Sequence, residues 1–350
     1  MAFLRSLHAW GGAILALVLM LLGLSGVGSV LRNQIVRATV PAARLAPPPS
    51  ASFGPALEAF QARAGEPIRA VLFAPDNMGV HRLYLQPGVS VYVDAQGREV
   101  SRWRGNRRIE ERVVAFHRDL LLGKAGGLLV SLTSLGGLGL VLSGLAVWAW
   151  PRPRFALRLA PASARRHDVL AAHRNLGSLF GVLLLVQLAT AVGLSYGGAA
   201  RVILGVATPI APRVEPVAGP VAWSRILSAA QARFPDARLG RVLAPGRPQD
   251  PYSVDLHRGG NLNPGGDTVV FVDGRGHVAG EVRSDGVNLG TLVYRGLLSV
   301  HSGDYGGNAS RVISGVVGIT LTLLGAYGLW SFASGPRAKG RSFRSRARTS

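Results

Sequence analysis

Four long apolar stretches constrain this chain more than any other feature of its sequence. They cover about 7–31, 125–150, 176–196 and 312–332, and each has roughly the 20 apolar residues needed to cross ~30 Å of hydrocarbon. Only 16% of the 350 residues are charged, whereas soluble domains have about 25%, so the chain has too few charges to coat a globular surface. We therefore predict a membrane protein with four transmembrane helices.

The first stretch needs a separate argument, because an N-terminal apolar run can also be a cleaved signal peptide. Arg5 is a basic residue at its start, and 25–29 contains small residues suited to cleavage. However, the run is longer than a usual signal core, and an internal repeat gives it a counterpart later in the chain. We therefore expect it to be retained as a helix.

Basic residues without acidic neighbours predict the orientation. The loop 151–174 has six arginines and one acid, Asp168, and the tail after Gly335 is basic with no acid. Both segments are expected in the cytoplasm, the tail against anionic lipid, which places both chain ends inside and the long loops outside. Because nearly all the basic residues are Arg, a bias of GC-rich bacterial genomes, we expect a bacterial inner membrane.

The predicted segments follow this topology. They are transmembrane helices over 1–31, 117–150, 174–197 and 309–333, outer modules over 32–116 and 198–308, a basic cytoplasmic loop over 151–173 and a basic tail over 334–350.

The two outer loops repeat one pattern. After a Pro-rich linker at 47–49, the first has a helical pattern over 55–64, alternating residues over 89–93 and a turn at 94–97. The second has the same order, with a helical pattern, an alternating run, a turn and a return strand over 223–234, 268–272, 273–276 and up to 282. Asp and Gly in these turns favour tight hairpins. The predicted fold is therefore a tandem repeat, membrane α-helical, with two outer α+β modules.

Four of the eight histidines occupy matching places in this repeat. His8 and His173 precede the first and third spans, and His117 and His301 precede the second and fourth. They predict two pairs, one near each membrane face. Neutral imidazole is a good iron ligand, and apolar four-helix bundles hold haem. The pattern predicts one or two bis-histidine b-type haems, although a histidine at the interface can also simply cap a helix.

Glycines follow these histidines at helical distance. They are Gly12, Gly123, Gly177 and Gly306. A macrocycle needs a groove without bulky side chains, and Gly12 and Gly177 are expected to supply one.

A known family shares this arrangement. The motifs Leu7-His8-x3-Gly12, Phe116-His117-x5-Gly123, Ala172-His173-Arg174-x2-Gly177 and Val300-His301-Ser302-Gly303-x2-Gly306 resemble the PepSY-associated transmembrane helix family. The resemblance implies that the outer loops are PepSY modules. Several members are linked to iron uptake, and some resemble reductases that release iron from siderophores using membrane haem. It therefore implies haem-ligand roles for His8, His117, His173 and His301.

Absent motifs narrow the partners. The chain has no cysteine, which excludes disulfides and thiolate metal sites. Gly123-Lys124 lacks the rest of a phosphate loop, and no dinucleotide fingerprint occurs, so the electron donor is expected to be a quinol or a reductase. A net charge of +21 suits nucleic acid, but long apolar runs argue against that partner.

A basic stretch before His117 suits a ferric substrate. Arg102, Arg104, Arg107 and Arg108 offer a surface for an anionic ferric chelate or siderophore, although a solvated or lipid-binding face explains them equally. No catalytic side chain is assigned.

Two functional hypotheses follow. In the first, the chain is a haem protein of the inner membrane that passes electrons outward to reduce ferric iron during uptake. In the second, it is not an enzyme, and its outer modules bind a peptide, an envelope component or a partner protein. A secondary transporter is a third reading, but charged residues deep in the spans are scarce. Whether the four histidines face one another distinguishes the first two.

Overall fold

The computed structural model describes residues 1–46, 52–75, 78–153, 155–207, 210–217, 219, 221–258, 266 and 268–335. The Pro-rich linker at 47–49 and the basic tail after Gly335 lie outside the described residues.

Four helices are long and apolar enough to cross a membrane, as predicted. They are α1 (Ala2–Val30), α5 (Gly123–Ala149), α6 (Arg166–Ser195) and α10 (Gly307–Ala333). Helix α1 packs against α5 and α10, and α6 packs against the same two, which closes a four-helix bundle. Gly23 of α1 faces Gly318 of α10 so closely that an added Cβ at Gly23 would lie 2.6 Å from the Gly318 carbonyl oxygen. Small residues here let the two backbones approach.

Shorter helices stand at the sheet end of the bundle. They are α2 (Arg32–Thr39), α4 (Ile109–Asp119), α7 (Gly197–Ile203) and α9 (Leu289–Ser302). Helix α4 ends where Leu120 and Leu121 take positive φ angles of 52° and 60°, and α9 ends at Gly303 with φ 77°.

These breaks correct the predicted span boundaries. His117 and His301 lie at the C-terminal ends of α4 and α9, not in the first turns of α5 and α10. The predicted second span, 117–150, therefore begins only at Gly123. Hydropathy missed the first break because the residues that form it are leucines and stay apolar.

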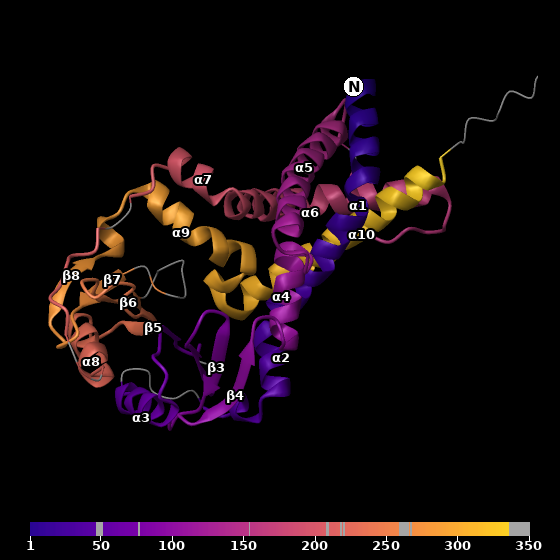
Figure 1. Cartoon of the computed structure of the whole chain (residues 1–350). Helices are drawn as coiled ribbons and strands as arrows, with labels where there is room; N and C mark the ends of the chain where they lie inside the picture. Colours follow the sequence, from indigo (N-terminus) through magenta and orange to yellow (C-terminus); the bar gives the residue numbers. More distant parts are fainter. Residues whose placement is uncertain are drawn as a thin grey trace, which may run out of the picture.

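The two outer modules form a single sheet (Figure 1). Its strands are β1 (Ala70–Leu72), β2 (His81–Tyr84), β3 (Val89–Val93), β4 (Glu99–Arg104), β5 (Arg238–Leu243), β6 (Tyr252–His257), β7 (Thr268–Val272) and β8 (Val278–Val282). The order is β4-β3-β2-β1-β5-β6-β7-β8. Strands β1 and β5 pair antiparallel with Val71 opposite Val242, so the halves that we predicted as two modules share one sheet.

Helices α3 (Gly54–Ala64) and α8 (Trp223–Arg233) cover one face of this sheet. They meet so closely that an added Cβ on Gly54 would lie 2.3 Å from Cα of Ser224. Trp223 is fully buried and its indole N–H donates to Oε1 of Gln61 (2.9 Å). Along β3, Val91 belongs to this core, whereas its neighbour Tyr92 packs in a second cluster with α2, as strand alternation requires.

The two predicted hairpin turns are present and alike. Oδ1 of Asp94 accepts from the backbone N–H groups of Gln96 and Arg98 (3.0 and 2.9 Å). Oδ1 of Asp273 accepts from those of Arg275 and His277 (both 2.8 Å). In each turn an Asp side chain satisfies the backbone donors of the residues that follow it.

Candidate functional site

One pair of histidines lies at the bundle end where the basic loop joins α5 to α6. His8 is near the start of α1 and His173 near the start of α6, and their ring centroids are 6.2 Å apart. Nδ1 of His8 is hydrogen-bonded to Oγ of Ser143 on α5 (3.0 Å). Nδ1–H of His173 donates to the carbonyl oxygen of Leu324 on α10 (3.1 Å). The neighbouring helices therefore hold both rings of this loop-side pair.

The other pair lies at the sheet end. The ring centroids of His117 and His301 are 5.9 Å apart. Nδ1–H of His117 donates to the carbonyl oxygen of Leu22 on α1 (3.1 Å), and that of His301 donates to the carbonyl oxygen of Gln187 on α6 (3.2 Å). This sheet-side pair thus joins α4 and α9 to the spans behind them.

The supporting residues obey the internal repeat. Leu22 and Gln187, which accept from the sheet-side pair, are separated by the same number of residues as His8 and His173. Hydroxyl groups one turn further along, Ser25 and Thr190, also lie 3.2 Å from Nδ1 of the same rings. Each half of the chain therefore holds the histidine of the other half in the same way.

The ring spacing fits two histidines that share one metal ion. Imidazole nitrogens bind first-row metals at about 2 Å, and about 1 Å separates the nitrogen from its ring centre, so two rings on opposite sides of an iron have centroids about 6 Å apart. The observed 6.2 Å and 5.9 Å agree with this value. No third His, Asp or Glu joins either pair within the described residues, which suits a macrocycle that supplies the remaining ligands.

The hydrogen bonds leave the correct nitrogen for a metal. In each ring the protein engages Nδ1, and no hydrogen bond from another described residue reaches Nε2. Metal-binding histidines usually donate their second nitrogen to a carbonyl or carboxylate in this way, which fixes the ring and its tautomer. The residues present therefore fit bis-histidine haem at both ends of the bundle.

Glycines face three of the rings, but they are not the glycines that we predicted. An added Cβ would lie 2.9 Å from Cε1 of His8 at Gly144, 3.3 Å from that of His117 at Gly26, and 3.5 Å from that of His173 at Gly328. Gly144 and Gly328 are separated by the same number of residues as His117 and His301. The repeat was the signal that identifies them, because a ring on one helix needs space on the next helix.

The predicted glycines have mixed surroundings. An added Cβ at Gly12 or Gly123 would meet nothing within 4 Å, so Gly12 leaves open space near His8 as expected. At Gly177 it would lie 3.7 Å from Leu324, an ordinary contact, and at Gly306 it would meet Ser310.

The predicted arginine patch is largely engaged in ion pairs. Arg102 binds Glu99 and Glu66 (2.8 and 2.7 Å), and Arg108 pairs with Glu110, whose side chain is fully buried. These two arginines stabilise the module, so the prediction that this stretch receives a substrate loses half of its residues.

Another carboxylate joins the sheet to the helix that carries His117. Oε1 of Glu111 on α4 accepts from Arg32 of α2 and from Arg82 of β2, both at 2.8 Å. The side chains of Glu111 and Arg82 are only 15% and 10% exposed. This bridge ties the position of α4, and with it His117, to the sheet.

His81 of β2 is buried away from both pairs. It packs between Phe53 and Phe73, its Nδ1 accepts from the backbone N–H of Ala74 (2.8 Å), and burial lowers its pKa to about 3. Its Nε2 has no partner within the described part of the chain.

Comparison with known proteins gives one match. The model of the family described as PepSY-associated TM region matches residues 5–334, which includes all four paired histidines. No curated protein matches the chain.

Proposed function

The chain belongs to the family of PepSY-associated TM regions, and from this premise we propose that it is a haem-binding membrane protein that carries electrons across the membrane to a ferric chelate. The loop-side and sheet-side pairs would each hold one haem. The observation that carries the proposal is the geometry of the pairs, with centroids 6.2 and 5.9 Å apart and Nδ1 of every ring bound to protein.

Haem held by two histidines supplies one-electron transfer. The residues of the chain do the rest. Ser143, Leu22, Leu324 and Gln187 orient the four rings and keep Nε2 toward the metal. The apolar bundle excludes water around them. From His8 to Ser25, which contacts His117, α1 rises about 25 Å, so the two pairs lie near opposite faces of a ~30 Å hydrocarbon layer.

The direction of transfer follows from the charges at the two ends. The loop end carries Arg152, Arg158, Arg165, Arg166 and Arg174 with Asp168 as the acid among them, which supports a cytoplasmic position in a bacterial inner membrane. A quinol or a reductase would give up an electron at that face. On the opposite face Fe(III) in the chelate would take up that electron and become Fe(II), which binds hard oxygen ligands less tightly.

The test is an absorption spectrum of the protein purified in detergent, oxidised and then reduced with dithionite, with haem quantified as the pyridine haemochrome. We expect a low-spin b-type spectrum and two haems per chain. His173→Ala and His301→Ala should each lose one haem, whereas His167→Ala and His277→Ala, which change exposed histidines in ion pairs with Asp residues, should keep both.

Two results would contradict the proposal. One is a protein that stays colourless when haem is supplied during expression. The other is haem content that is the same in His173→Ala, His301→Ala and the controls. Either result would favour the alternative, a membrane protein whose sheet binds a peptide, an envelope component or a partner protein.

A further inference from the structure

A cavity of about 250 Å³ lies where the sheet meets the membrane helices. On the sheet its wall is the junction of the two halves, where the backbone N–H of Phe73, just after β1, donates to the carbonyl oxygen of Gly240 in β5 (3.0 Å). On the helical side its wall is the end of α1, the start of α2 and the turn between α9 and α10. Both halves of the chain therefore build this cavity.

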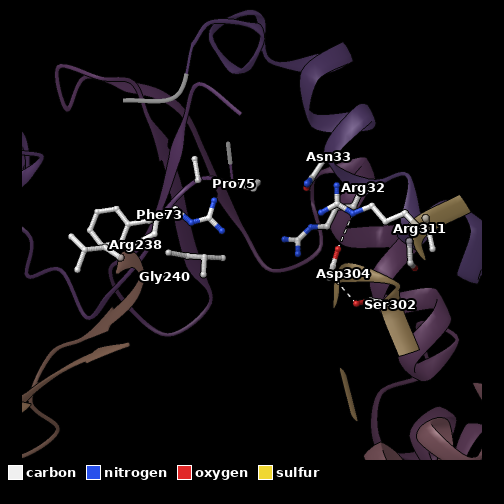
Figure 2. Close-up of a pocket in the computed structure, with 14 residues that line it drawn as sticks. Arg32, Asn33, Phe73, Pro75, Arg238, Gly240, Ser302, Asp304 and Arg311 are labelled. Atoms are coloured by element: carbon white, nitrogen blue, oxygen red, sulfur yellow. Dashed lines mark hydrogen bonds and ion pairs between the residues drawn. The ribbon is translucent and has the colours of Figure 1, made fainter. Parts of the chain in front are cut away.

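Three arginines and one acid line the cavity, so its wall is positive. Figure 2 shows Arg238 on the sheet side, facing Arg32 and Arg311 on the helical side. Arg311 donates to Asp304 (2.9 Å) and Arg32 to Glu111 (2.8 Å). A guanidinium has five N–H donors in a planar fork, so a single ion pair leaves donors for a second carboxylate.

The cavity adjoins the sheet-side histidine pair. Ser302, in its wall, follows His301 directly in the chain. Ser29, also in its wall, donates to the carbonyl oxygen of Ser25 (2.9 Å), whose hydroxyl lies 3.2 Å from Nδ1 of His117. A ligand in the cavity is therefore separated from either histidine by only one or two residues.

We propose that this cavity binds the iron substrate and that it selects an anionic chelate with carboxylate groups. The assignment rests on the proposed function, since it names the ligand class taken beside the sheet-side pair. Carboxylates match the forked donors of arginine, and a group of three such side chains with one acid attracts a net negative ligand. Asp304 narrows the choice, because it repels a carboxylate that does not reach Arg311.

The volume points to a small chelate. Pockets for drug-sized ligands measure about 300–1,000 Å³, and this cavity is just below that range. A hydroxycarboxylate complex such as a metal citrate, or one arm of a larger carboxylate siderophore, fits that space better than an entire neutral hydroxamate siderophore.

The experiment measures binding without electron transfer. Gallium(III) citrate has nearly the size and charge of the ferric complex but is not reduced, so isothermal titration of the full-length protein in zwitterionic nanodiscs reports binding alone. We expect saturable binding that weakens about tenfold in Arg238→Gln and in Arg311→Gln, the loss typical of one charge-assisted contact. Asp304→Asn should bind at least as tightly as the wild type. Arg275→Gln, which changes an exposed arginine in the β7–β8 turn, is the matched control.

Several results would overturn the assignment. They are absence of binding, equal affinity in Arg238→Gln, Arg311→Gln and the control, and equal affinity for a neutral gallium hydroxamate. Displacement of the citrate complex by phosphatidylglycerol in the nanodisc would identify the cavity as a lipid headgroup site instead. The outcomes separate from those of the haem test, because a colourless protein that binds gallium citrate refutes the haem proposal alone, and a haem protein that does not bind it refutes this one.

Discussion

Replacing Gly144 by alanine tests whether the space beside His8 is part of a ligand site. Gly144 lies on α5 next to Ser143, the hydrogen-bond partner of His8. A Cβ at this position would lie 2.9 Å from Cε1 and 3.5 Å from Nδ1 of the ring. Because carbon atoms in contact are normally about 3.5–4.0 Å apart, the ring or the helix must move by roughly half an ångström or more.

The size of the effect follows from that displacement. Adding a methylene to a packed site costs about 1–3 kcal/mol, and 1.4 kcal/mol is a factor of ten in affinity. If the strain falls on the ligand ring, haem at the loop-side pair should bind about 5- to 150-fold more weakly. The sheet-side pair, about 25 Å away along α1, should be unaffected.

The assay is transfer of haem to apomyoglobin, followed in time, together with the haem content per chain. We expect one haem of two to leave Gly144→Ala rapidly while the other stays. Gly139→Ala is the control on the same helix, since a Cβ at Gly139 meets nothing within 4 Å. Two haems with the wild-type transfer rate in Gly144→Ala would refute the reasoning that this ring is held rigidly as a ligand.

Three further changes test the sheet and its link to the bundle. Glu111→Gln removes the shared partner of Arg82 and should cost about 3 kcal/mol, seen as a lower Tm; an unchanged Tm would mean that the bridge does not contribute. Gly54→Ala should force α3 from α8, because its Cβ would lie 2.3 Å from Cα of Ser224, and should make the sheet sensitive to protease; wild-type resistance would argue against this close contact. Since the pKa of His81 is lowered to about 3 in the folded protein, the unfolded chain binds its proton first, and stability should fall as the pH drops from about 6.5 toward 3, by about 1 kcal/mol per pH unit. His81→Asn should flatten that part of the unfolding profile, and an equally steep profile would assign the effect to other groups.

Hydropathy predicted the four spans within a few residues, apart from the start of α6, because membrane thickness sets their length. The hairpins were predictable from Asp94 and Asp273, whose side chains favour the turns that they form. Strands β1, β2, β5 and β6 were not predicted. β1 has only three residues, and β2 begins His81-Arg82, where buried polar side chains hide the strand pattern. The pairing of β1 with β5 depends on contacts between distant halves, which no local pattern records.

The pairs of histidines could be predicted because a tandem repeat places equivalent residues at equivalent depths. Their supports could not, since Leu22 and Leu324 act through backbone carbonyls and any residue type supplies one. The arginines of the cavity were also missed. Arg32, Arg238 and Arg311 are far apart in the chain, and the joined sheet brings them to one wall.

The pairing of histidines across the repeat has a consequence for how such a chain arises. His8 and His117 are in the first half and His173 and His301 in the second, so a half on its own contains no complete pair. A protein of half this length would complete both sites only as a head-to-head dimer, with β1 of one copy against the same strand of its twin. Gene duplication and fusion would then preserve the sites while freeing each copy to diverge, and Ser25 opposite Thr190 and Leu22 opposite Gln187 are differences of that kind.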